Sequence, residues 1–128
     1  MCAEIKQLCH LAIPKLTRSA EMCEQYVKGG VPKEACIQPA KDVKEVLMPI
    51  IAACHEHLKV CTDSKCIAAC QSSLKTAEKA VEKNTACFDA CGGAGSDDDC
   101  KIVCQDCAQA CRACIKSFEA YEHNVCNK

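Results

Sequence analysis

The sequence predicts an all-α protein: an antiparallel up-down-up-down four-helix bundle with a cysteine-lined core, formed by residues 1–128 as one domain. Three observations predict this fold. Only five Gly and four Pro interrupt long stretches of Ala, Lys, Glu and Leu, a composition typical of helices. Helix-ending and helix-capping signals divide the chain into four segments of similar length. In each segment, core-type residues recur at alternating steps of three and four.

The first two helices are expected near residues 3–28 and 39–61. Pro14 and Pro49 fall inside them, where each removes a backbone donor, so we expect kinks rather than helix ends. The connection between the two helices carries residues that end one helix and begin the next: Gly29, Gly30, Pro32 and Pro39.

The third and fourth helices are expected near residues 64–91 and 97–125. Asp63 is the predicted N-cap of the third helix, and Ser96 that of the fourth. Three acidic residues follow Ser96, in the first turn, where the helix dipole favours them. Short connections between helices of equal length make neighbours antiparallel.

Cysteine is the unusual component of this sequence, with 16 among 128 residues. The three-and-four stepping places 15 of the 16 on the predicted inward stripes, and only Cys126 lies one residue off. The first stripe is Cys2, Ile5, Cys9, Ala12, Leu16, Ser19, Cys23 and Tyr26. The second is Cys36, Ala40, Val43, Leu47, Ile50, Cys54, His57 and Cys61. The third is Cys66, Cys70, Ser73, Ala77, Ala80, Asn84, Cys87 and Cys91. The fourth is Cys100, Cys104, Cys107, Cys111, Cys114, Phe118, Tyr121 and Val125.

Folding the hairpins predicts which cysteines meet. One end of the bundle should gather Cys23, Cys36, Cys87, Cys91, Cys100 and Cys104, with Cys87 level with Cys104 and Cys91 level with Cys100. At the other end, Cys61 should lie beside Cys66 and His57 beside Cys70, near Cys2, Cys54 and Cys126. The middle should hold Cys107, Cys111 and Cys114, opposite Ala77, Ala80 and Asn84.

This arrangement favours metal binding, and copper(I) in particular. Helical residues three or four apart have Cβ atoms about 5–6 Å apart, which is too far for a regular disulfide. Soft thiolates select copper(I), zinc or iron–sulfur clusters, but zinc and iron–sulfur sites use folded loops rather than straight helical rows. Buried thiols can exchange protons for copper(I) and keep the core neutral, which predicts about one copper per cysteine. The predicted ligands are all 16 cysteines and His57.

These features resemble the bacterial copper storage proteins, which are cysteine-lined four-helix bundles. The resemblance covers the whole chain, and its most specific part is the run of alternating Cys-x-x-x-Cys and Cys-x-x-Cys steps from Cys100 to Cys114. It implies a homotetramer and multiple copper(I) ions per chain, with His or Met residues assisting entry at one end. The side chains whose part in entry stays open are His10, His55, His123, Met22 and Met48, with the two methionines interpreted as packing residues.

Other functions are weighed against storage. Cys66/Cys70 and Cys87/Cys91 also resemble the twin motif of small mitochondrial chaperones that are stapled by disulfides. Three further alternatives are storage of another soft metal such as zinc, a thiol-disulfide enzyme, and cysteines that merely fill a core. We expect no enzyme, because the Pro/Gly surroundings and the strand context of a thioredoxin-like site are missing.

Charge and hydropathy bound the partners and the location. The net charge of -1 argues against a nucleic-acid partner. The longest apolar run, from Val46 to Cys54, contains Pro49 and is too short to cross a membrane. We expect an unprocessed start and a cytoplasmic location, with export as the alternative if the sequence is a trimmed mature form. No donor or acceptor protein for copper can be read from the sequence.

Overall fold

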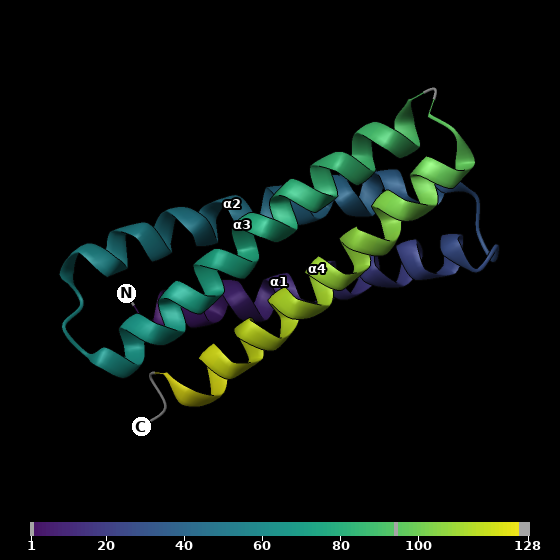
Figure 1. Cartoon of the computed structure of the whole chain (residues 1–128). Helices are drawn as coiled ribbons and strands as arrows, with labels where there is room; N and C mark the ends of the chain where they lie inside the picture. The colour runs from purple at the N-terminus through teal and green to yellow at the C-terminus, as the bar shows by residue number, and fades with distance from the viewer. Residues whose placement is uncertain (1, 94, 126–128) are drawn as a thin grey trace.

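A computed structural model describes residues 2–93 and 95–125 and places them in a four-helix bundle (Figure 1). The helices are α1 (Cys2–Val27), α2 (Ile37–Val60), α3 (Ser64–Gly92) and α4 (Asp97–Asn124), and the short 3-10 helix η1 (Lys33–Cys36) precedes α2. Helices α1 and α3 each contact both α2 and α4. Because consecutive helices run in opposite directions, the predicted up-down-up-down bundle is confirmed.

The connections between the helices define the two ends of the bundle. The α1–α2 and α3–α4 connections lie together at one end, on the right in Figure 1, which we call the hairpin end. The α2–α3 junction lies at the opposite end together with the start of α1 and the finish of α4, and we call this the terminal end. This placement decides which cysteines can meet.

Side-chain caps fix the starts of α3 and α4 as predicted. The Asp63 carboxylate accepts hydrogen bonds from the backbone N–H groups of Lys65 at 3.0 Å and Cys66 at 3.4 Å. The Ser96 hydroxyl accepts from the Asp99 N–H at 3.2 Å. After α1, Gly29 adopts a φ of 84°, a left-handed conformation that glycine tolerates without a Cβ clash.

Replacing Asp63 with Ala is expected to lower the free energy of unfolding by about 1 kcal/mol, because two N–H groups of the first α3 turn lose their acceptor. Urea unfolding followed by circular dichroism measures the change. The neighbouring Thr62→Ala variant is the control, since Thr62 is exposed and is not the cap, and it should stay within about 0.5 kcal/mol of wild type. Equal losses in both variants would contradict the capping role.

The core lies where the stripes predict it. Every described stripe residue is buried except Cys2 and Cys61, which are half-buried. Between the thiols pack aliphatic and aromatic side chains that are closed to solvent: Ile5, Leu16, Val43, Leu47, Ile50, Phe118 and Tyr121. The core of the bundle is therefore built from thiols together with aliphatic and aromatic side chains.

Two prolines lie within unbroken helices. Pro14 in α1 and Pro49 in α2 are exposed, so the carbonyl groups that lose a helical partner can be hydrated. Helix α2 begins two residues earlier than expected, at Ile37, which leaves Pro39 in the first turn, where its missing N–H is not needed. None of the described helices combines the length and the hydropathy required to cross a bilayer.

Candidate metal centre

Almost all described cysteines lie in the core as free thiols, as the stripes predict. Thirteen free cysteines are buried: Cys9, Cys23, Cys36, Cys54, Cys66, Cys70, Cys87, Cys91, Cys100, Cys104, Cys107, Cys111 and Cys114. Cys61 is also free and is half-buried at the end of α2. Cys2 differs from the expectation, because it is disulfide-bonded and offers no thiolate in this form. Cys126 lies outside the described residues.

Five thiols form a cluster at the hairpin end, and we call Cys23, Cys36, Cys87, Cys91 and Cys104 the hairpin cluster. The Cys87 Sγ atom lies 3.7 Å from Cys23 Sγ, 3.9 Å from Cys91 Sγ and 3.6 Å from Cys104 Sγ. The sulfur atoms of Cys91 and Cys104 are 3.4 Å apart. The cluster therefore draws on α1, η1, α3 and α4, and it joins residues 23–36 to residues 87–104.

Two overlapping sets of three donors make up this cluster. In the set Cys23, Cys87 and Cys104, and in the set Cys36, Cys91 and Cys104, all sulfur atoms lie within 4.8 Å of one another. Cys104 belongs to both sets. The predicted meeting of Cys87 with Cys104 is confirmed, whereas Cys91 faces Cys104 rather than Cys100. The Cys100 thiol instead donates to the Ala90 carbonyl oxygen at 3.1 Å.

The middle of the core contains a small polar network beside the thiols of α4. The Ser19 hydroxyl donates to Asn84 Oδ1 at 2.7 Å, and Asn84 Nδ2 donates to the Ala80 carbonyl at 2.7 Å and to Cys111 Sγ at 3.3 Å. The sulfur of Cys107 lies 4.0 Å from the Ser19 oxygen. The sequence placed Ser19 and Asn84 in the core but did not give them a role. The signal that could have indicated their hydrogen-bond network is that each is a polar side chain at a heptad core position.

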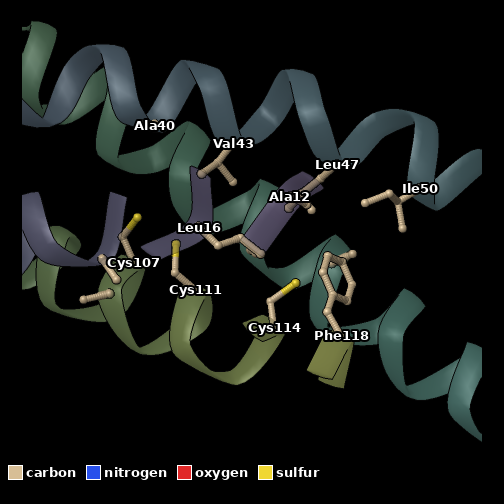
Figure 2. Packing of buried hydrophobic residues seen from close by; sticks show 14 of the residues in the cluster. Ala12, Leu16, Ala40, Val43, Leu47, Ile50, Cys107, Cys111, Cys114 and Phe118 are labelled. Atoms are coloured by element: carbon tan, nitrogen blue, oxygen red, sulfur yellow. The ribbon is translucent and has the colours of Figure 1, made fainter. Parts of the chain in front are cut away.

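Figure 2 shows what surrounds the central thiols. Cys107, Cys111 and Cys114 project from α4 toward the interior, where side chains of α1 and α2 face them. Among these are Leu16, Val43 and Leu47, which are fully buried. The thiols therefore line one part of the central core, and aliphatic side chains fill the rest.

The terminal end carries a mixed donor set, and we call His57, Cys61 and Cys66 the junction site. Their donor atoms lie within 4.8 Å of one another. The His57 Nε2 atom is 2.8 Å from Cys66 Sγ, so His57 meets Cys66 and not Cys70 as expected. The Cys70 thiol donates to the Cys54 carbonyl at 3.6 Å. Cys61 lies beside Cys66, as predicted.

The remaining sequence candidates lie on the surface of the bundle or pack beside the core. His10 Nδ1 is 3.4 Å from Glu122 Oε1, and His55 Nε2 is 3.9 Å from Glu78 Oε2, so each lies beside a carboxylate of a neighbouring helix. His123 is exposed. The two methionines are off the stripe, as expected: Met22 packs against the core and Met48 is half exposed.

Burial keeps many of the core thiols protonated. Desolvation raises the pKa of Cys9 and of Cys114 to about 12 and that of Cys66 to about 11, from an ordinary value of 9.0. Desolvation is also the largest cause of the raised pKa values of Cys54, Cys70 and Cys91. These groups are therefore neutral at pH 7 in the metal-free protein, which avoids the cost of buried charge.

Two thiols have lowered pKa values because neighbouring groups donate to them. Side-chain hydrogen bonds, from Cys104 first and then from Cys23 and Cys87, lower the pKa of Cys36. A hydrogen bond with Cys107, followed by those of Asn84 and Ser19, lowers the pKa of Cys111. The hairpin cluster and the middle of the core thus each contain one thiol whose thiolate form is favoured by its neighbours.

The disulfide-stapled chaperone predicted as an alternative does not agree with this arrangement. Cys66, Cys70, Cys87 and Cys91, the four cysteines of the twin motif, are all free thiols. The segment between the pairs is continuous helix, part of α3, rather than the loop that such a hairpin requires. The clustered cysteines can instead bind metal ions.

Comparison of the chain with protein-family models, with curated proteins and with solved structures finds no match.

Proposed function

We propose that this protein stores copper(I) on the thiolates of its core and thereby buffers the supply of copper. The observation that carries the proposal is the hairpin cluster of five free thiols. Four of its sulfur atoms approach one another to 3.4–3.9 Å, and Cys36 Sγ lies within 4.8 Å of those of Cys91 and Cys104, without any of the five forming a disulfide. The resemblance of Cys100 to Cys114 to the bacterial copper storage proteins supports the same function. The proposal includes no catalytic step.

Coordination geometry favours copper(I) over zinc in the core. Three sulfur atoms around one ion, with bonds of about 2.3 Å, are about 4.0 Å apart in a trigonal plane. The two sets of the hairpin cluster come close to this spacing. Among the described residues, no fourth Cys, His, Asp or Glu donor joins either set within the same distance. A low-coordinate soft ion fits such sets, whereas structural zinc requires four ligands.

Charge balance supports the same choice. A monovalent ion that displaces one thiol proton leaves the core neutral, and a bridging thiolate can bind two such ions. A zinc ion bound by three core thiolates would leave a net negative charge away from water, which is costly. Repeated exchange of one proton for one copper therefore allows the whole core to fill, with about one copper per cysteine.

An anaerobic copper(I) titration against a competing chelator tests the proposal. We expect a capacity in the low to middle teens per chain, and the release of about one proton per copper bound in weak buffer. Saturation at one or two ions per chain would refute storage. Zinc binding with the same capacity and a higher affinity would favour storage of zinc.

Two serine variants make a matched pair for this titration. Cys104→Ser removes the sulfur shared by both sets, so we expect a loss of at least about two copper ions. Cys100→Ser removes a neighbouring thiol that belongs to neither set, and the expected loss is about one ion. Equal losses would count against the shared role of Cys104.

The proposed location is a reducing compartment such as the cytoplasm, because closely spaced thiols persist there. The homotetramer implied by the resemblance stays a prediction, and sedimentation equilibrium of the full chain tests it.

A further inference from the structure

We propose that the junction site (His57, Cys61 and Cys66) is a separate site for one divalent zinc-class ion. This inference does not rest on copper storage, since it concerns a different donor set at the opposite end of the bundle from the hairpin cluster.

The donor chemistry differs from that of the rest of the core. The hairpin cluster offers sulfur only, whereas the junction site combines one imidazole with two thiols. Two thiolates balance the charge of a divalent ion, and a neutral imidazole adds a third ligand without adding charge. Mixed sulfur and nitrogen coordination is characteristic of zinc in proteins. The junction site can therefore bind a divalent ion without leaving a buried net charge.

The backbone holds the three residues at a tight turn. His57 lies in the last turn of α2, Cys61 is its C-cap with an extended backbone, and Cys66 is in the first turn of α3. The Cys61 N–H donates to the His57 carbonyl at 2.9 Å, and the Asp63 side chain accepts from the Cys66 N–H at 3.4 Å. Gaps of three and four residues between ligands match the short spacings of zinc sites.

The three donor atoms of the junction site would need to move only slightly to bind a zinc ion. Around a tetrahedral zinc ion with bonds of about 2.0 and 2.3 Å, nitrogen and sulfur ligands are about 3.5 Å apart. His57 Nε2 and Cys66 Sγ are 2.8 Å apart, and all three donor atoms lie within 4.8 Å of one another. A small side-chain rotation would lengthen the distance between His57 Nε2 and Cys66 Sγ to the value that a zinc ion requires. The half-buried Cys61 leaves a route for water to complete the coordination.

The burial of His57 gives an independent reason to expect a ligand here. The imidazole is 7% exposed, and its Nδ1 atom has no hydrogen-bond partner within the described part of the chain. A buried polar atom without a partner is costly, so the single contact with Cys66 does not account for placing a histidine at this core position. Metal coordination would give the imidazole a strong interaction that this buried position lacks, through Nδ1 directly or through Nε2 in place of the contact with Cys66.

Zinc and cobalt(II) titrations of the reduced, metal-free full chain test the proposal under anaerobic conditions. We expect one tight zinc ion per chain in competition with a chromophoric chelator. Cobalt(II) at the same site should give the intense visible bands of a tetrahedral complex and a thiolate charge-transfer band. Absence of tight zinc binding, an octahedral cobalt spectrum, or several equivalent zinc ions per chain would overturn the proposal.

Variants locate the ion. His57→Ala and Cys61→Ser should each weaken zinc binding by more than about 100-fold, since even loss of a supporting contact costs 10–100-fold. The controls are His55→Ala, an exposed histidine two residues away, and Cys100→Ser at the hairpin end, and both should keep wild-type affinity. Because Cys61 is half-buried at a helix end, Cys61→Ser keeps the test valid if His57→Ala fails to fold. Unchanged zinc affinity in Cys61→Ser would overturn the assignment, and copper capacity measured separately shows whether storage stands.

Discussion

Metal-free protein is expected to lose stability steeply as the pH rises above about 9. The pKa values of Cys9 and Cys114 are raised from 9.0 to about 12 by burial, so the folded protein retains protons that the unfolded chain releases. The stabilising effect is fully present below pH 9 and is lost as the pH approaches about 12. Each thiol removes up to about 1.4 kcal/mol per pH unit, which makes about 3 kcal/mol per unit for the pair. Anaerobic urea unfolding across this range measures the slope.

A double variant isolates the two thiols in that experiment. Replacing Cys9 and Cys114 together with Ala lowers stability at every pH through lost packing, but it should flatten the alkaline slope by about 3 kcal/mol per pH unit. If wild type and double variant have the same slope, these thiols do not titrate as described. Under the proposed function, copper-loaded protein should show little alkaline loss, because its sulfur atoms no longer carry protons.

Replacing Asn84 with Leu is expected to destabilise the metal-free protein by about 1–3 kcal/mol. Leucine fills a similar volume, but the buried Ser19 hydroxyl loses the acceptor that it now holds at 2.7 Å. Cys111 also loses a donor that favours its thiolate form. Chemical denaturation measures the stability, and the rate of thiol alkylation reports on Cys111.

A double-mutant cycle separates the network from simple packing. If the unsatisfied hydroxyl causes the loss, Ser19→Ala in the Asn84→Leu background should recover most of it, since removing both partners is nearly neutral. Ser19→Ala alone should cost less than Asn84→Leu, because Asn84 keeps its bond to the Ala80 carbonyl. Additive losses would contradict a coupled network.

The fold could be predicted from the sequence because one periodic pattern runs through each helix. The stepping that placed Cys100 to Cys114 on one face of a helix depends only on helical geometry, and all five are buried. Asp63 and Ser96 act as caps because their side chains bond to residues two or three positions away. Local chemistry of this kind can be read from the sequence.

The pairing of residues across helices could be predicted only in part. Cys91 meets Cys104 rather than Cys100, because the Cys100 thiol turns to the Ala90 carbonyl. His57 reaches Cys66 in the first turn of α3, whereas the Cys70 thiol, one turn further along, donates to the Cys54 carbonyl. Such choices depend on rotamers and on the shift between helices, which periodicity does not fix. The packing of Leu16 and Val43 opposite the central thiols also depends on how α1 and α2 lie against α4, which follows neither of them directly in the sequence.

The position of Cys104 in two overlapping donor sets has a consequence for how cargo could travel inside the bundle. Under the proposed function, an ion bound by Cys23, Cys87 and Cys104 could pass to Cys36 and Cys91 while it stays bound to Cys104. Such a relay never releases the ion as a free aquated species. Under the proposed function, the hairpin cluster would therefore transfer ions within the core as well as hold them.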